Sequence, residues 1–226
     1  MGKDSPTLFG PSFPERPLET GAYERLFREE GFLFIAGTDE AGRGALAGPV
    51  VAAAVIRPES YDLPGLNDSK KLDRRNRERL SAEIPRAALA WAVGLATAGT
   101  IDRVNILNAA LGAMLKACNR LTPAPDLILV DGSQPLPTAT RQYTLKQGDG
   151  RCASIAAASI LAKVYRDRLM ALLERKYPGY GFADHKGYGA QSHLDALRTL
   201  GPSPVHRRSF KPLSAWLASE EGLFGA

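Results

Sequence analysis

Residues 126–132 form a short, almost uninterrupted apolar run that ends in a carboxylate, Asp131, followed by a glycine. A run of strand length without polar alternation is typical of a strand that is buried on both faces. Such a strand needs cover on both sides of its sheet. The run therefore predicts an α/β fold built around a central sheet.

Other apolar runs predict the neighbouring strands. Residues 32–38 and 49–56 are of strand length, and the turn 39–44 between them predicts that they pair as a hairpin. Residues 88–97 predict a third strand, and residues 142–146 predict a weaker one. The strands alternate with helical patterns, as expected for one mixed sheet flanked by helices.

Helices are predicted between and after these strands, at residues 73–83, 101–120, 152–176, 191–200 and 212–220. Small side chains dominate the first turns of the segment 152–176, which favours a close approach to the sheet. We predict three parts: an N-terminal extension at 1–30 with a short helix near its end, a catalytic domain at 31–176 and a helical C-terminal segment at 177–226 that completes the substrate cleft.

Length and composition exclude several classes of protein. The chain has 226 residues, of which 44% are hydrophobic and 23% charged, so it can bury a substantial core and is not disordered as a whole. No apolar stretch reaches the ~20 residues that cross a bilayer, and no secretory leader is recognisable. Cys118 and Cys152 lack metal-site spacing, so we expect buried thiols in a reducing cytoplasm.

Positive charge is concentrated after the first 30 residues. The net charge is +5, and residues 1–30 hold four basic and six acidic side chains, which leaves +7 on the remainder. Residues 67–86 alone contain seven basic and four acidic groups. This excess favours a polyanionic partner without identifying it.

Carboxylates follow two of the predicted strands. Asp39 and Glu40 end one apolar run, and Asp131 ends another. An adjacent acidic pair alone is most often a solvated strand end. If both strands are central and aligned, however, the three groups converge and repel one another unless cations neutralise them.

Oxygen ligands without histidine or cysteine suit Mg²⁺ or Mn²⁺. Asp149, in a glycine-flanked turn before a predicted helix, is a fourth candidate, although alone it would be an ordinary turn aspartate. Four carboxylates around two ions would form a two-metal site for phosphodiester hydrolysis.

Three further segments have both a structural and a functional interpretation. Gly42-Arg43-Gly44 allows a ligand to approach the backbone closely, but alone is a weak signal. Lys70, Lys71 and the basic helix predicted after them suit phosphate contacts or a solvated face. Tyr188, between glycines, suits stacking on a sugar or base, or the cap of a hydrophobic cluster.

Five segments in order resemble bacterial ribonuclease HII over about residues 32–212. They are Gly37-Thr38-Asp39-Glu40-Ala41-Gly42-Arg43-Gly44 with 46–55, Asn67-Asp68-Ser69-Lys70-Lys71-Leu72, Val130-Asp131-Gly132, 156–164 with Arg166-Asp167, and His185-Lys186-Gly187-Tyr188-Gly189. The resemblance implies a ribonuclease H-like fold. It also implies an endonuclease that hydrolyses the RNA strand of RNA–DNA hybrids and nicks 5′ of single ribonucleotides in duplex DNA, leaving 3′-hydroxyl and 5′-phosphate ends, as in ribonucleotide excision repair.

The resemblance also assigns residues. Its four metal-binding, catalytic carboxylates fall on Asp39, Glu40, Asp131 and Asp149, with two Mg²⁺ or Mn²⁺ ions expected. Its substrate-binding residues fall on Gly42, Arg43 and Gly44, which contact a ribonucleotide 2′-hydroxyl through the backbone, on Ser69, Lys70 and Lys71, and on the junction-sensing Tyr188. We expect a cytoplasmic monomer.

The chain departs from the family pattern in two places, and two alternative functions stay open. Ala45 stands where the family usually has proline, and residues 1–30 have no counterpart in the shortest members. The alternatives are another metal-dependent nuclease on the same fold, such as a ribonuclease HIII-like enzyme, and a non-catalytic nucleic-acid-binding module. The second would not need four carboxylates.

Overall fold

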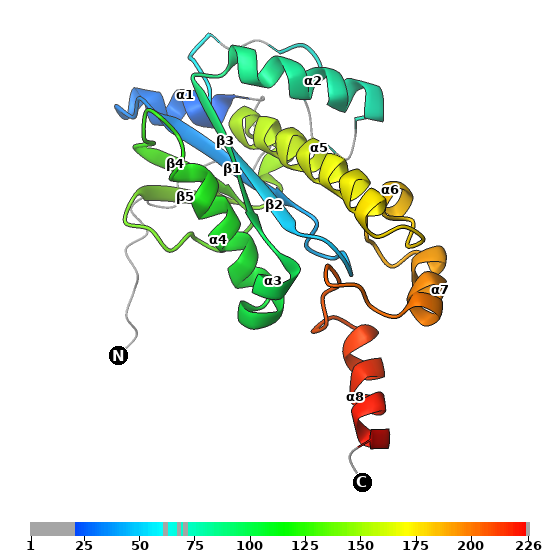
Figure 1. The fold of residues 1–226 in the computed structure, drawn as a ribbon. Coiled ribbons are helices and arrows are strands. Elements are labelled where there is room, and N and C mark those ends of the chain that lie inside the picture. The colour runs from blue at the N-terminus through cyan, green and yellow to red at the C-terminus, as the bar shows by residue number, and fades with distance from the viewer. Residues whose placement is uncertain (1–20, 61–62, 67–68, 70–71, 225–226) are drawn as a thin grey trace, which may run out of the picture.

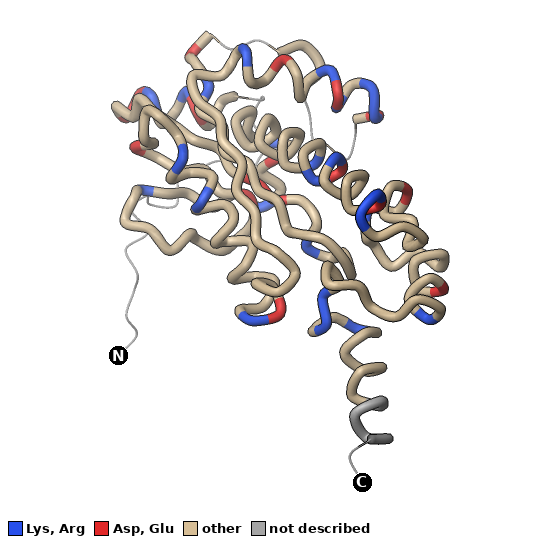
Figure 2. Tube along the Cα trace, viewed as in Figure 1, with Lys and Arg blue, Asp and Glu red and all other residues tan. Residues whose placement is uncertain are grey.

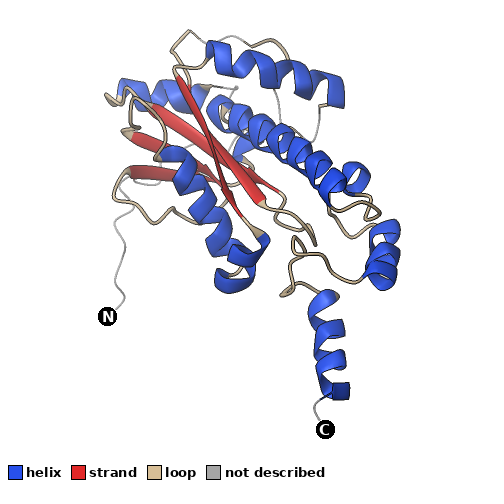
Figure 3. Cartoon of the chain, in the orientation of Figure 1, coloured by secondary structure: helices blue, strands red, loops and turns tan. Residues whose placement is uncertain are grey.

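The computed structural model describes residues 21–60, 63–66, 69 and 72–224, with a five-stranded mixed sheet at its centre. The strands are β1 (Ile35–Ala41), β2 (Val50–Ile56), β3 (Ala90–Ala96), β4 (Leu127–Asp131) and β5 (Arg141–Leu145), in the spatial order β3-β2-β1-β4-β5. Helices cover both faces of this sheet (Figures 1 and 3). The predicted α/β fold is confirmed.

Strand β1 lies at the centre of the sheet and has a different relation to each neighbour. It pairs antiparallel with β2, which confirms the predicted hairpin, and its partner on the other side is β4, which runs parallel to it. The parallel register places Thr38 beside Val130. Asp39 and Asp131, the next residue of each strand, therefore lie at the same end of the β1–β4 pair.

One face of the sheet is covered by α5 (Ala153–Lys176) and α2 (Arg74–Ala87). The small residues at the start of α5 allow the close approach that the sequence predicts. A Cβ atom on Gly37 of β1 would lie 2.3 Å from the backbone nitrogen of Ile155, so only glycine fits there. Asp73 caps α2, as predicted, by accepting a hydrogen bond from the Asn76 N–H at 2.7 Å.

The opposite face is covered by two helices where the sequence predicts one. The predicted helix 101–120 is wrong in its continuity, because the structure has α3 (Ala98–Val104) and α4 (Ile106–Cys118). Asn105 separates them with φ 66°, a left-handed conformation, and its side chain accepts the Asn108 N–H at the start of α4. The apolar period continues across this break, so the pattern of hydrophobic residues did not reveal it.

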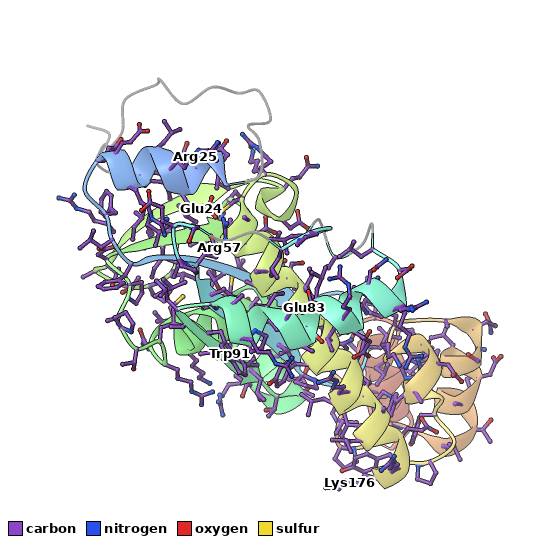
Figure 4. The ribbon with its side chains drawn as sticks, turned by 90° about the horizontal axis from the view of Figure 1, so that it is seen from above. Glu24, Arg25, Arg57, Glu83, Trp91 and Lys176 are labelled. Atoms are coloured by element: carbon purple, nitrogen blue, oxygen red, sulfur yellow. The ribbon has the colours of Figure 1, made fainter. Side chains whose placement is uncertain are left out.

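The helix predicted near the end of the N-terminal extension is α1 (Ala22–Glu29), and it packs on the same sheet face as α5. Tyr23 and Phe27 are buried there against β4 and β5. Figure 4 shows Glu24 of α1 and Arg57, just after β2, lying close together; their ion pair of 3.3 Å is almost fully buried.

The C-terminal segment continues past the end of α5 with α6 (Phe182–His185), α7 (Gln191–Leu200) and α8 (Leu213–Phe224). The sequence missed α6 and predicted the other two. An isolated β-bridge between Ala47 and His206 joins this segment to the loop after β1. No helix in the described part of the chain is both long and apolar enough to cross a membrane.

Candidate active site

A cavity of about 550 Å³ opens where β1 and β4 end together. Three of its lining residues are the carboxylates predicted from the ends of the two apolar runs, Asp39, Glu40 and Asp131. The parallel register of β1 and β4 brings these groups together, although they are about 90 residues apart in sequence. The convergence inferred from the sequence is therefore present.

Asp39 is the most deeply buried of the three, with 5% of its surface exposed. Burial, followed by the nearby charges of Glu40 and Asp131, raises its pKa well above the ordinary range. A hydrogen bond from Ser159 of α5 lowers that pKa in part. Ser159 in turn lies 2.9 Å, hydroxyl to hydroxyl, from Ser69, which links the predicted substrate-binding loop to the carboxylate cluster.

Glu40 has a mixed environment. Burial and the charge of Asp131 raise its pKa, whereas Arg43, whose Nη1 lies 3.3 Å from a Glu40 oxygen, opposes that increase. The Glu40 backbone N–H also donates to Asp39 Oδ1 at 2.7 Å, which fixes the orientation of the Asp39 carboxylate. Neighbouring carboxylates that resist ionisation are well suited to exchange their protons for a cation.

Asp131 is oriented by the turn that carries the fourth candidate. The Gly148 N–H donates to Asp131 Oδ1 at 2.7 Å, so the turn after β5 is bound to the end of β4. Asp149 follows in a short 3₁₀ segment, η1 (Gly148–Gly150), and is 5% exposed. Asp149 therefore directly follows the residue that binds Asp131, but it is not among the residues that line the cavity.

The three acidic side chains in the cavity provide oxygen ligands that suit a hard divalent cation. All three are carboxylates, which is the ligand type that Mg²⁺ and Mn²⁺ prefer. Among the described residues, no three side chains of Asp, Glu, His or Cys are arranged so that they could hold a metal ion by themselves. Mg²⁺ ordinarily takes one or two carboxylates and completes its shell with water and substrate oxygens, so the group suits an ion that shares its ligands with a substrate.

The predicted substrate-binding residues also meet at this cavity. Gly42, Arg43, Gly44, Ser69 and Tyr188 all line it, and Tyr188 remains 40% exposed. Lys70 and Lys71 lie outside the described residues. Ala45, where proline was expected, is fully buried, and its N–H points to the Gly42 carbonyl at 3.4 Å, a contact that proline could not make.

Two further cations complete the lining, Arg77 of α2 and Lys163 of α5. Sequence reasoning considered the basic helix of Arg77 as a whole for phosphate contacts without singling out Arg77, and it missed Lys163. Arg77 donates to the Ser69 and Leu72 carbonyls, which ties α2 to the loop before it. Lys163 pairs with Asp167 at 2.8 Å within α5. In the sequence both cations resemble ordinary surface charges of amphipathic helices.

The same two cations line a second cavity of about 430 Å³ between α2, α5 and α6. Arg74, Arg168 and Lys186 add positive charge to it, and Glu78, Asp167 and Asp184 add negative charge. Figure 2 shows Lys and Arg positions along both α2 and α5. The two cavities therefore form neighbouring parts of one charged surface.

Comparison with known sequences identifies one family. The family model described as ribonuclease HII matches residues 36–213. The chain is 51% identical to the ribonuclease HII of Syntrophotalea carbinolica over 205 residues, which cover 91% of this chain and 98% of that relative. It is 56% identical to the ribonuclease HII of Geobacter sulfurreducens over 189 residues, which cover 84% and 87%.

The fold leads to the same family. The crystal structure of the ribonuclease H2 from Pyrococcus horikoshii OT3 matches with a TM-score of 0.68 at 27% identity, over 81% of this chain and 96% of that one. The residues that the family model matches, 36–213, include Asp39, Asp131, the glycine-arginine-glycine turn and Tyr188. The chain therefore belongs to the ribonuclease HII family.

Proposed function

We propose that this chain hydrolyses the RNA strand of RNA–DNA hybrids and nicks duplex DNA on the 5′ side of a single embedded ribonucleotide, leaving 3′-hydroxyl and 5′-phosphate ends. Membership of the family makes the chain a metal-dependent endoribonuclease. The observation that supports the finer statement most strongly is the single cavity that combines Asp39, Asp131 and the 42–44 turn.

Asp39, Glu40, Asp131 and Asp149 would hold the divalent ions. When bound, Mg²⁺ or Mn²⁺ would lower the pKa of a water molecule and stabilise the charge that develops on the leaving oxygen. The Gly148 N–H and the Ser159 hydroxyl would hold the carboxylates in place through their hydrogen bonds. We infer that the ion is Mg²⁺ or Mn²⁺ because the cavity offers only hard oxygen donors.

The other lining residues would bind the nucleic acid. The backbone of Gly42, Arg43 and Gly44 would approach the ribose, where the 2′-hydroxyl is the group that distinguishes RNA from DNA. Tyr188 would stack on the sugar or base at the junction. Arg77 and Lys163, together with the predicted phosphate ligands Ser69, Lys70 and Lys71, would contact the backbone without reading sequence.

We further propose that the enzyme acts as a monomer and that residues 177–226 complete its cleft. Tyr188, from the C-terminal segment, lines the active-site cavity together with residues of β1 and α5. Cys118 and Cys152 are unpaired and buried, which suits the reducing cytoplasm in which we expect the protein to work.

The test is cleavage of a labelled DNA duplex that contains one ribonucleotide, with Mg²⁺, with Mn²⁺ and with a chelator. We expect a metal-dependent nick on the 5′ side of the ribonucleotide and a 3′-hydroxyl end. An all-DNA duplex of the same sequence is the control and should stay intact. Cleavage confined to longer RNA tracts would favour a different nuclease on this fold, and binding without cleavage would favour a non-catalytic module.

A further inference from the structure

Two arginines lie fully buried behind the 42–49 loop. They are Arg166 of α5 and Arg207 of the segment 204–210 before α8, which we call the strap. Neither guanidinium forms an ion pair with a carboxylate of the described residues. Burial of a charge without a counter-ion is expensive unless hydrogen bonds compensate it. Burial also lowers the pKa of Arg207 to about 9, and the charge of Arg166 contributes to the decrease.

The compensation comes from the carbonyl groups of the loop. Arg207 donates to the carbonyls of Gly42 and Arg43, at 2.7 Å each, and twice to that of Gly48, at 3.0 and 3.1 Å. Arg166 donates to the carbonyls of Pro49, at 3.0 Å, and Ala47, at 3.2 Å. The loop therefore directs a series of carbonyl oxygens inward, toward two cations.

The geometry of the peptide group determines which way the N–H groups of this loop point. In a trans peptide the C=O and N–H bonds point in opposite directions. Because Arg207 holds the Gly42 and Arg43 carbonyls on the buried side, the N–H groups of Arg43 and Gly44 point away from it. Within the described part of the chain, neither N–H donates a hydrogen bond. Two free donors are thus directed toward the cavity that these residues line.

Arg166 supports the same wall from another side. Its guanidinium carbon lies 5.4 Å from the centroid of the Tyr188 ring, within range of a cation–π contact. A Cβ atom on Gly42 would lie 1.9 Å from Arg166 Nε, and Gly42 has φ 95°. Arg166 Nη1 is buried and has no hydrogen-bond partner among the described residues.

We propose that Arg207 and Arg166 are positioning residues for ribose recognition: they hold the loop carbonyls inward, so that the Arg43 and Gly44 N–H groups and the Tyr188 ring face the sugar that carries the 2′-hydroxyl. This inference rests on the proposed function. It assigns specificity to two residues that contact no substrate. Because a lysine has no planar fork, it cannot hold both loop carbonyls in the same way.

The experiment measures dissociation constants for two DNA duplexes that differ only in one 2′-hydroxyl, with Ca²⁺ in place of Mg²⁺. For the unaltered protein we expect the ribonucleotide duplex to bind up to about 10-fold more tightly, the value of one or two hydrogen bonds. Arg207→Lys and Arg166→Lys should reduce this ratio toward 1 and leave affinity for the all-DNA duplex within about 2-fold. A merely structural defect would weaken binding of both duplexes and preserve the ratio.

Arg198→Lys is the matched control, because Arg198 is an exposed arginine of α7 that pairs with Asp195; it should keep the full ratio. If the buried substitutions prevent folding, Asp102→Ala takes their place. Asp102 accepts three hydrogen bonds from Arg208 and Ser209, next to Arg207, and its loss should reduce the ratio by loosening the strap.

A full ratio in folded Arg207→Lys, or in Asp102→Ala where the lysine variants do not fold, would overturn the inference. So would equal binding of the two duplexes by an unaltered protein that still cleaves. Absence of both discrimination and cleavage in the unaltered protein would instead overturn the proposed function. Cleavage with discrimination lost only in the variants supports both proposals.

Discussion

At the scale of single residues, the active site contains buried carboxylates that lower the stability of the folded protein. Asp39 is buried beside two other carboxylates, and this environment raises its pKa. The folded metal-free protein therefore holds protons that the unfolded chain releases. Its stability should decrease as pH rises from about 4, the ordinary pKa of aspartate, through the higher pKa of the folded state.

Asp39→Asn should remove this penalty. We expect the variant to have a larger free energy of unfolding than the unaltered protein at pH 7 in chelator, and the gain should disappear near pH 4. Activity should decrease by more than about 100-fold, since even outer-sphere partners of metal ligands contribute 10–100-fold. Urea unfolding at several pH values tests the first statement. Asp195→Asn, at an exposed ion pair, should show no gain, and a destabilised Asp39→Asn protein would contradict the explanation.

The buried histidines have the opposite pH dependence. His206 Nε2 lies 3.0 Å from His193 Nε2, with His185 stacked on His193 and Tyr180 packed against His206. Burial, and then the charge of His193, lowers the pKa of His206 to about 4. Since the unfolded histidine takes up a proton near pH 6.5, stability should be lost as pH falls from 6.5 toward 4.

His206→Gln should make this loss less steep. The variant is expected to be less stable at pH 7, because Ser203 and His193 lose a partner, but its free energy of unfolding should change less between pH 6.5 and 4. Chemical unfolding in buffers across that interval measures the slope. An unchanged slope would show that another group controls the acid sensitivity.

At the scale of elements, α1 is anchored through one carboxylate. Glu24 Oε1 accepts the Ser154 N–H, at the first turn of α5, at 2.7 Å and pairs with Arg57. Glu24→Ala would leave a buried arginine without this anion, a change that typically costs about 3–5 kcal/mol. We expect that loss in the free energy of unfolding, measured by urea titration.

The matched control for this anchor is Glu29→Ala on the same helix, because Glu29 is exposed. It should change stability by less than about 0.5 kcal/mol. If Glu24→Ala and Glu29→Ala were equally mild, α1 would not depend on the buried pair.

The elements also show how far the sequence could be interpreted. Apolar runs that end in carboxylates predicted β1 and β4, and Asp39 and Asp131 were expected to meet on the condition that these strands are central and aligned. The parallel register that brings them together depends on contacts between distant segments, which no local pattern specifies. Asn105 breaks a predicted helix because its backbone conformation is left-handed, and periodicity does not report that angle.

Arg207 illustrates the same limit within the site. It stands next to Arg208 in the basic segment 204–210, and nothing in the sequence distinguishes the two. The structure buries Arg207 completely and leaves Arg208 exposed. The difference arises because the strap returns to the 42–49 loop, where the Arg207 N–H donates to the Leu46 carbonyl at 2.8 Å.

At the scale of the whole molecule, the adjoining cavities suggest how a duplex lies on the protein. The active-site cavity and the α2–α5–α6 cavity share Arg77 and Lys163, and Arg74 lines the far one. A nucleic acid backbone seated in the first would continue over the second. Each phosphate neutralised there releases counterions, so affinity should depend steeply on salt.

Arg74→Ala should remove about one phosphate contact. We expect weaker binding of hybrid and all-DNA duplexes alike, and a decrease of about 1 in the slope of log affinity against log salt concentration. Fluorescence anisotropy between 50 and 200 mM salt provides the measurement. Arg103→Ala, on α3 at the other face of the sheet, is the control and should keep the slope. Equal slopes for both variants would place the duplex elsewhere.

The most direct measurement compares cleavage and binding in Asp131→Asn, which changes one carboxylate and keeps its shape. Cleavage of a duplex with one ribonucleotide should decrease by more than about 100-fold in Mg²⁺, while its dissociation constant stays within a few-fold of the unaltered value. Cleavage near the unaltered rate would contradict the central claim that the carboxylates at the ends of β1 and β4 form the catalytic site.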